Sequence, residues 1–205
     1  MRTVPGAAHA ASGRVSQMRI ISGRFGGRDL GSVPEGVRPT SDRVRESLFS
    51  TLGSVEGVRV LDLFAGTGAL GLESISRGAQ RVVFVERSRR IARDLQARLD
   101  LLGLGDSDQV RLMTLDASKA IRRLEKEGDE RFDLVFLDPP YEKGDRVATL
   151  TALFSTDILD AEARVVVEGP KRHPLPPLPG VRVLETRDYG DTKLTWLEAS
   201  GSVEG

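Results

Sequence analysis

The feature that most constrains the fold is an alternation of short apolar runs and helical periods that begins at Val58. The runs are nearly continuous in apolar residues, which is typical of strands buried on both faces of a parallel sheet. Between two of these runs, Ile91, Leu95 and Leu99 recur at helical spacing. Strands that alternate with helices in this way predict βαβ units joined by right-handed crossovers. The expected strands cover 58–64, 81–85, 110–115, 132–137 and 163–168.

Turn and capping residues place the helices between these strands. One helix should end at Arg77, with Gly78 as its C-terminal cap. Another should be capped by Ser88 and end at Gly103. A short helix is expected around 121–124, and a further one over roughly 145–155.

The flanking segments predict smaller β units. Residues 18–33 are expected to form a β-hairpin that turns at Gly26 and Gly27, and a helix follows that Thr40, Ser41 or Asp42 can cap. Near the other end, 181–187 and 192–197 predict a terminal hairpin after a proline-rich loop. The expected organisation is a disordered tail (1–17), a β-hairpin extension (18–37), an α/β domain (38–198) and a second tail (199–205).

Composition excludes several classes of function. The 30 Lys and Arg balance the 30 Asp and Glu, so the chain is not a generic polycation, although a local basic patch remains open. Without Cys there is no thiolate metal site or cysteine nucleophile, and two His make a histidine-rich site unfavourable, so we expect no metal. No apolar run approaches the ~20 residues that span a bilayer. Residues 1–17 lack the apolar region of a secretory signal, so a cytoplasmic protein without a membrane partner is expected.

A glycine-rich turn joins the first strand to its helix. Gly66, Gly68 and Gly71 match G-x-G-x-x-G, in which glycines let the backbone turn tightly and approach a ligand. A tight turn without a ligand is the alternative. Asp62 precedes the turn inside the apolar strand, where a carboxylate is costly unless it is paired. Such a carboxylate favours a ligand with a positive pole and repels a pyrophosphate, which favours S-adenosylmethionine over NAD.

Two further acids end neighbouring strands. Glu86 lies about 20 residues after the glycine turn, where a carboxylate can bind the hydroxyls of a ribose. Asp116 follows the next strand and should face the same crevice. Each acid can instead cap a helix or lie in solvent.

A short motif, Asp138-Pro139-Pro140-Tyr141, follows the apolar strand 132–137. The prolines fix the backbone, so the Asp138 carboxylate and the Pro139 carbonyl form two adjacent acceptors. A nucleobase –NH₂ group is a double donor that fits this pair, and Tyr141 offers a ring on which the base can stack. The motif therefore predicts catalysis of methyl transfer to a base amine, with a polyproline-like turn as the structural alternative.

The chain resembles the bacterial 16S rRNA guanine-N2 methyltransferases of the RsmD type. The resemblance covers about residues 18–198 and includes RIISGRFGGRDL (19–30), RPTSDRVRESLF (38–49), VLDLFAGTGALGLESISRGA (60–79), FDLVFLDPPY (132–141) and YGDTKL (189–194). It implies a Rossmann-like class I S-adenosylmethionine-dependent methyltransferase fold, with a seven-stranded, mostly parallel sheet, helices on both faces and an antiparallel last strand. It also implies cofactor contacts at Asp62, Phe64, Ala65, Gly66, Thr67, Gly68, Gly71, Glu86, Asp116 and Ala117.

The resemblance implies action on a guanine of small-subunit rRNA, the site called guanine(966), in an assembled or nearly assembled particle. The protein is expected to be a monomer. The stretch 18–45 holds six Arg and three acids, so RNA contact is expected there. Pairing of these Arg with Asp42 and Glu46 is the alternative. The expected RNA contacts are Arg19, Arg24, Arg28, Arg38, Arg43 and Arg45.

Three other functions remain open from the sequence. The Asp138–Tyr141 motif also serves adenine-N6 methylation of DNA or RNA. The glycine pattern is shared with nicotinamide oxidoreductases, against which Asp62 argues. A catalytically inactive RNA-binding assembly factor is the third possibility.

Overall fold

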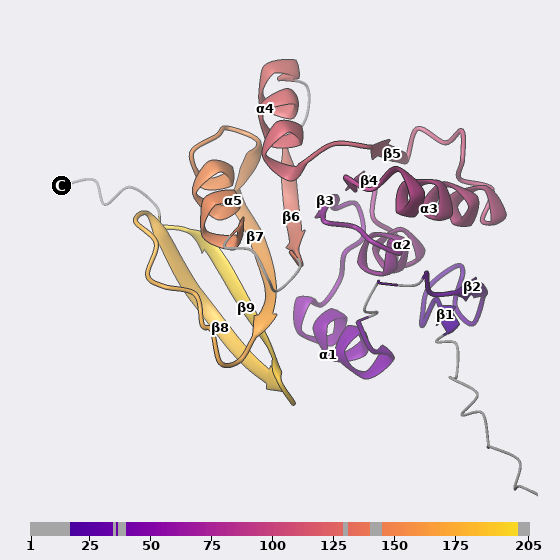
Figure 1. The fold of residues 1–205 in the computed structure, drawn as a ribbon, viewed down its shortest axis with the longest axis horizontal. Helices are drawn as coiled ribbons and strands as arrows, with labels where there is room; N and C mark the ends of the chain where they lie inside the picture. The colour runs from indigo at the N-terminus through magenta and orange to yellow at the C-terminus, as the bar shows by residue number, and fades with distance from the viewer. Residues whose placement is uncertain (1–16, 35, 37–39, 129–130, 140–144, 201–205) are drawn as a thin grey trace, which may run out of the picture.

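The computed structural model describes residues 17–34, 36, 40–128, 131–139 and 145–200. Within them, seven strands form one sheet and a separate pair forms a small hairpin (Figure 1). The strands of the sheet are β3 (Arg59–Leu63), β4 (Arg81–Val85), β5 (Val110–Met113), β6 (Phe132–Leu137), β7 (Leu159–Pro170), β8 (Val181–Tyr189) and β9 (Thr192–Ala199). The helices are α1 (Asp42–Leu52), α2 (Ala69–Ser76), α3 (Arg89–Leu101), α4 (Ala117–Glu127) and α5 (Asp145–Phe154).

The strand order β5-β4-β3-β6-β7-β9-β8 places β3, the first strand of the alternation, in the middle of the five parallel strands. The pairs among β3, β4, β5, β6 and β7 are parallel. The last strand, β9, lies between β7 and β8 and is antiparallel to both. The structure therefore confirms the expected seven-stranded, mostly parallel sheet and its antiparallel last strand.

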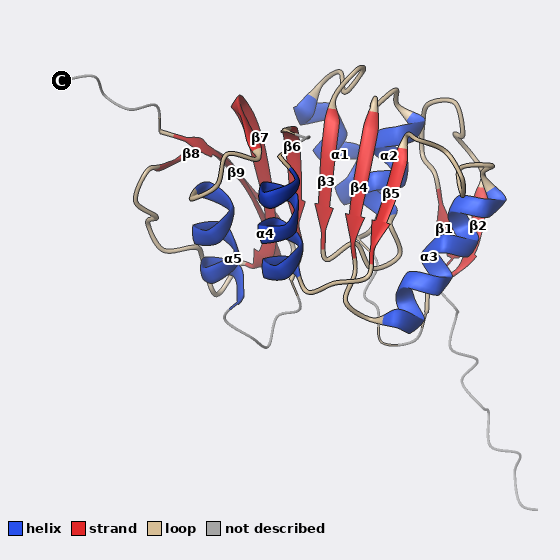
Figure 2. Ribbon diagram, turned by 90° about the horizontal axis from the view of Figure 1, so that it is seen from above, coloured by secondary structure: helices blue, strands red, loops and turns tan. Residues whose placement is uncertain are grey.

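The two faces of the sheet carry different helices, and Figure 2 shows α4 and α5 on one face and α1 and α2 on the other. Alternate residues of each strand serve the two faces: Val60 joins the core beneath α1, α2 and α3, whereas Leu61 joins the core beneath α4 and α5. Both residues are fully buried. Burial on both faces explains why these strands read as continuous apolar runs.

Capping residues set the helix ends largely as expected. The hydroxyl oxygens of Ser41 and Ser88 accept hydrogen bonds from the backbone N–H groups of Val44 and Ile91. After α3, Gly103 has a φ of 71°, the left-handed conformation that commonly ends a helix. The predicted limits of β4 and β6 are confirmed, whereas β5 ends two residues earlier and β7 is longer at both ends than expected.

The N-terminal hairpin consists of β1 (Gln17–Arg19) and β2 (Asp29–Ser32), and it is held against the sheet domain by buried polar contacts. Glu73 of α2 is fully buried and accepts hydrogen bonds from the backbone N–H groups of Ile21 (2.8 Å) and Ser22 (3.0 Å). The hairpin loop passes so close to α2 that a Cβ on Gly23 would lie 1.8 Å from the Ser76 carbonyl oxygen. The expected hairpin is confirmed, and it packs directly on the helix that follows the glycine turn.

Candidate active site

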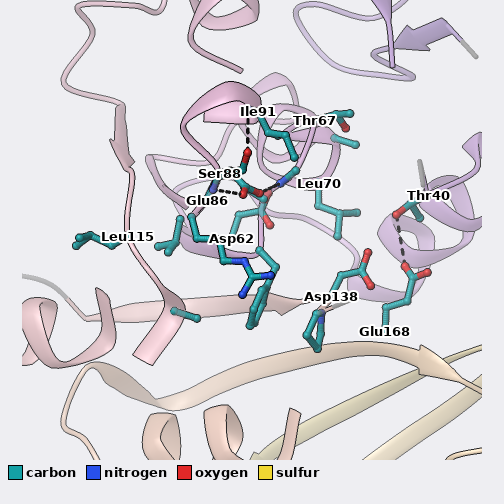
Figure 3. A pocket seen from close by; sticks show the side chains of 18 of the residues that line it. Thr40, Asp62, Thr67, Leu70, Glu86, Ser88, Ile91, Leu115, Asp138 and Glu168 are labelled. Atoms are coloured by element: carbon teal, nitrogen blue, oxygen red, sulfur yellow. Dashed lines mark hydrogen bonds between the residues drawn. The ribbon is translucent and has the colours of Figure 1, made fainter. Parts of the chain in front are cut away.

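A pocket of about 460 Å³ opens at the carboxyl edge of the parallel strands (Figure 3). This is the edge where open α/β sheets bind their ligands. Nine of the residues predicted for cofactor or substrate line it: Asp62, Phe64, Ala65, Gly66, Thr67, Glu86, Ala117, Asp138 and Pro139. The structure thus brings residues from β3, β4, α4 and β6 to one cavity.

The glycines of the turn have two different roles, one in lining the pocket and one in packing. Gly66 lines the pocket and has a φ of 55°. Phe64, two residues earlier, has a φ of 64°, a left-handed backbone conformation that is costly for any residue other than glycine. Gly68 and Gly71 do not line the pocket. A Cβ on Gly71 would lie 2.2 Å from the Phe84 ring, so this glycine allows α2 to pack closely on β4. Gly71 therefore serves the packing of α2 behind the turn, and a cofactor contact through either glycine stays a prediction.

Asp62 is a buried acid of the site with a strongly raised pKa. Its side chain is 3% exposed, and Oδ2 accepts a hydrogen bond of 3.0 Å from the Gly71 N–H. Burial, with a smaller contribution from the nearby Glu86 charge, raises the pKa of this carboxyl to about 7, against the lowering effect of the Gly71 hydrogen bond. A positively charged ligand in the pocket would favour the ionised form, as the position of this acid predicts.

Glu86 is also buried and binds the turn itself. Its Oε2 accepts a hydrogen bond of 3.1 Å from the Gly66 N–H, and its Oε1 accepts one of 2.7 Å from the Ser88 N–H. A carboxylate has about four acceptor positions, so these two bonds leave capacity for ligand hydroxyls. Glu86 therefore links the glycine turn to the start of α3 at the wall of the pocket.

Asp116 adopts the capping role that the sequence left open. Its side chain accepts a hydrogen bond of 3.1 Å from the Ser118 N–H at the start of α4. Its neighbours Leu115 and Ala117 line the pocket, whereas Asp116 itself does not. A cofactor contact through Asp116 stays a prediction.

Asp138 and Pro139 follow β6 at the same edge, and both line the pocket. Asp138 is half-buried and Pro139 is buried, and Figure 3 shows the Asp138 carboxylate directed into the cavity. Pro140 and Tyr141 lie outside the described residues. The geometry therefore brings the first acceptors of the motif to the cavity that Asp62 and Glu86 line.

The predicted RNA-binding arginines differ in exposure. Arg19, Arg24, Arg28 and Arg43 are exposed, and Arg38 lies outside the described residues. Arg19 donates from Nε to Asp42 at 2.7 Å, which is the local pairing that the sequence left open. The guanidinium carbons of Arg24 and Arg28 lie 4.7 Å and 5.5 Å from the centre of the Phe25 ring.

Arg45 corrects one expectation, because its side chain is only 2% exposed. Its Nη2 donates to the Arg19 carbonyl at 2.8 Å and to Asp42 at 2.6 Å, and its Nη1 lies 3.7 Å from Glu73 Oε2. A guanidinium enclosed in this way cannot meet an RNA phosphate at the surface. The prediction of RNA contact for Arg45 is wrong, since helical spacing turns this side chain inward beside Leu48 and Phe49.

Sequence reasoning missed several residues of the pocket. Thr40 and Glu168 line it from the segment before α1 and from β7, and Thr40 Oγ1 donates to Glu168 Oε2 at 3.4 Å. Glu168 ends an apolar run as Glu86 does, and that signal could have identified it. The other missed lining residues are Gly36, Ala69, Leu70, Val85, Arg87, Ser88, Ile91 and Leu115.

A group of exposed arginines at the start of α3 was also missed. Arg87, Arg89, Arg90 and Arg93 are all exposed, and the first turn of α3 contains no acid. Positive charge is unfavourable at a helix N-terminus, so this clustering runs against the preference of the helix dipole. We call these four residues the α3 arginine group; its signal in the sequence is the run RSRR followed by Arg93.

Within the described part of the chain, no group of three or more His, Cys, Asp or Glu side chains could hold a metal ion. None of the helices described here combines the length and the apolar character needed to cross a membrane.

Comparison with known proteins agrees with this geometry. Ribosomal RNA small subunit methyltransferase D of Escherichia coli (strain K12) is 38% identical, covering 83% of this chain and 82% of its own. YlbH of Bacillus subtilis (strain 168) is 36% identical over 90% of this chain and all of its own. The solved structure of yhhF from Escherichia coli superposes with a TM-score of 0.77 at 30% identity, covering 90% of this chain and 98% of that one.

These matches confirm the expected class I S-adenosylmethionine-dependent methyltransferase fold. The family model described as "Conserved hypothetical protein 95" matches residues 18–198, the range that the motifs indicated. The chain therefore belongs to this family, together with ribosomal RNA small subunit methyltransferase D and YlbH.

Proposed function

We propose that the protein transfers a methyl group from S-adenosylmethionine to the N2 amine of a guanine in small-subunit rRNA. The observation that carries the proposal is one pocket lined both by Asp62 and Glu86 and by Asp138 and Pro139. The 38% identity to ribosomal RNA small subunit methyltransferase D supports rRNA as the substrate. The finer proposal is the site called guanine(966), methylated in an assembled or nearly assembled particle by one protein molecule in the cytoplasm.

The described residues fit the proposed cofactor. Asp62 is buried next to the pocket with a pKa near 7, so it gains from a neighbouring ammonium or sulfonium group. Glu86 has remaining acceptor capacity for ribose hydroxyls, and Phe64, Leu70, Ile91 and Leu115 supply apolar walls. When bound, S-adenosylmethionine supplies an electrophilic methyl group.

The residues after β6 prepare the amine. The Asp138 carboxylate and the Pro139 carbonyl accept the two N–H bonds of the N2 amine and hold its lone pair toward the cofactor side of the pocket. Methylation replaces one N–H bond by an N–C bond and releases one proton. Asp138 stabilises the positive charge that develops on N2 before that proton leaves. Tyr141 as a stacking platform remains part of the proposal.

The basic surface is proposed to hold the RNA backbone. Arg24 and Arg28 flank Phe25 on the hairpin, which combines charge with an aromatic face. The α3 arginine group adds exposed positive charge beside the pocket, since Arg87 also lines it. A target base must leave its stack to reach Asp138, which favours an exposed loop of the rRNA.

The proposal is tested by methyl transfer from labelled S-adenosylmethionine to small subunits that lack base methylation, followed by nucleoside mass spectrometry. N2-methylguanosine is the expected product, and mapping of the modified position tests guanine(966). N6-methyladenosine would refute the guanine assignment while leaving a methyltransferase. Absence of product on subunits, free rRNA and DNA, with cofactor still bound, would favour an assembly factor.

A single substitution tests the role of Asp138. Asp138→Ala should lower turnover by at least about 100-fold, because it removes the acceptor and the charge that act on N2. Its affinity for the cofactor, measured by calorimetry, should stay within about twofold of wild type. Unchanged turnover would remove Asp138 from the proposed chemistry.

A further inference from the structure

The register of the parallel strands sets residues side by side at the pocket edge. Leu63 pairs with Val85 and with Leu137, and Leu137 pairs with Val167. The next residue on each strand therefore lies at one level across the sheet. Three of these four residues are acids, in the order Glu86, Phe64, Asp138 and Glu168.

Glu168 is the acid next to Asp138 in this row. Neighbouring strands lie about 4.8 Å apart, and residues at one level project to the same face. Leu137 and Val167 both belong to the core beneath α4 and α5, so Asp138 and Glu168 face the opposite side, toward the segment before α1. Figure 3 shows the two carboxyl groups side by side at one end of the pocket.

The surroundings hold the Glu168 side chain in place. It is 9% exposed, and its Oε2 accepts the hydrogen bond from Thr40 Oγ1. Because β7 lies between β6 and β9 at this point, where Glu168 pairs with Leu194, its backbone is fixed by the sheet. The structure therefore holds a carboxylate in a fixed position beside the proposed amine site.

The edges of guanine and adenine differ at the atom next to the reacting amine. In guanine, the N2 amine adjoins N1–H, which is a hydrogen-bond donor. In adenine, the N6 amine adjoins N1, which carries a lone pair and only accepts. A carboxylate beside the amine site therefore attracts guanine and repels adenine, because a carboxylate has acceptors only.

We infer that Glu168 accepts a hydrogen bond from N1–H of the target base while Asp138 holds the N2 amine, and that Glu168 thereby selects guanine over adenine. The inference rests on the proposed function and names the specificity-determining residue of that site. Thr40 is a positioning residue, which orients the carboxylate through Oε2. A carboxylate can accept about four hydrogen bonds in all.

The test replaces the target guanine by 2-aminopurine in reconstituted small subunits. This base keeps the 2-amino group but has a lone pair at N1, where guanine has N1–H. Wild-type protein should methylate it with a kcat/KM about 10- to 100-fold below that for guanine, the range expected for loss of a hydrogen bond to a charged group. Equal rates on both bases would overturn the inference without any variant.

Glu168→Gln then assigns the discrimination to this side chain. The amide can donate to the N1 lone pair, so the ratio of kcat/KM between guanine and 2-aminopurine should fall at least about fivefold. Differences between the two bases in intrinsic reactivity or at O6 affect the ratio of wild type and of the variant equally, so they cancel when the two ratios are compared. A merely structural role would lower both rates equally and keep the ratio, which would also overturn the inference.

Two controls separate this result from misfolding and from failure of the proposed function. Glu162→Gln makes the same change at an exposed position of β7 and should leave the ratio unchanged. Thr40→Val removes the positioning hydroxyl and should shift the ratio in the same direction by a smaller factor, even if Glu168→Gln does not fold. Absence of any N2-methylguanosine with wild type would refute the proposed function itself, whereas product with an unaltered ratio refutes only the role of Glu168.

Discussion

At the scale of single residues, Asp62 shows a conflict between stability and ligand binding. Its carboxyl has a pKa of about 7 in the folded chain and an ordinary value of 3.8. Between these values the unfolded chain is ionised and the folded chain is protonated, so rising pH favours unfolding. This penalty is small below about pH 4, grows up to pH 7 and is constant above it. The chain tolerates the penalty at a position where an ionised carboxylate would bind a cationic ligand.

Asp62→Asn should therefore stabilise the protein more at pH 8 than at pH 5. The neutral amide still accepts from the Gly71 N–H but has no ionisation penalty. The increase in the free energy of unfolding over wild type should be about 2–3 kcal/mol larger at pH 8 than at pH 5, from about 1.4 kcal/mol per pKa unit. Urea denaturation at the two pH values measures this difference.

The same variant provides the functional side of that test. Its affinity for S-adenosylmethionine should fall by about tenfold or more, because the proposed charged partner of the cofactor is lost. A stability difference that does not change between pH 5 and pH 8 would contradict the raised pKa of Asp62. Unchanged affinity would remove Asp62 from the proposed cofactor site.

At the scale of elements, the sequence predicted those strand limits and helix ends that depend on neighbouring residues in the chain. The limits of β4 and β6 follow from apolar runs bounded by polar residues, and Ser88 caps α3 as its spacing indicated. The length of β7 did not follow, because its first pair, between Leu159 and Phe132, depends on the partner strand. Strand extension by a neighbour that lies far away in sequence leaves no local pattern.

The attachment of the hairpin to α2 is another element-scale feature, and it depends on Glu73. This buried carboxylate accepts hydrogen bonds from the hairpin backbone and from Arg77 Nε at 2.7 Å. Glu73→Gln should destabilise the fold by about 3–5 kcal/mol, because the buried Arg45 and the partly buried Arg77 lose the opposite charge of Glu73. Hydrogen exchange of the Ile21 and Ser22 amides should accelerate more than exchange of the β4 amides.

The matched control for this prediction is Glu125→Gln on the exposed face of α4. It should change the free energy of unfolding by less than about 0.5 kcal/mol, as surface substitutions generally do. If exchange at Ile21 and Ser22 in Glu73→Gln rose only in step with the β4 amides, the hairpin would be part of the global unfolding unit. That result would contradict a specific tether through Glu73.

At the scale of the whole molecule, strand order decides which predicted residues meet. The glycine turn, Glu86 and Asp138 could be predicted because each follows an apolar run at the carboxyl edge. The adjacency of Asp138 and Glu168 could not, since it requires β7 to pair with β6 and depends on their register. The prediction of RNA contact for Arg45 failed for a related reason. Its charge indicates an exposed position, whereas the packing of α1 on the sheet encloses its side chain.

Net charge also conceals the distribution of charge over the molecule. The chain is neutral as a whole, yet the α3 arginine group is exposed beside the pocket. The C-terminal half of α4 lies at the opposite edge of the sheet, where Glu127 binds Arg111 of β5. The start of α3 (Arg89, Arg90 and Arg93) and the C-terminal half of α4 (Arg122, Arg123 and Lys126) each offer three exposed cations, which makes a matched comparison possible.

Replacing Arg89, Arg90 and Arg93 together by Gln should weaken binding to small-subunit rRNA and reduce its salt dependence. Each lost phosphate contact should lower the slope of log K against log salt concentration by about 0.7–0.9. Removal of Arg89 and Arg90 from the first turn of α3 should leave the melting temperature unchanged or higher, because their charge opposes the helix dipole. The control replaces Arg122, Arg123 and Lys126 of α4, which removes the same charge far from the pocket. A slope that falls equally in both variants would show that only net charge matters, and the α3 arginine group would then have no specific place in the RNA interface.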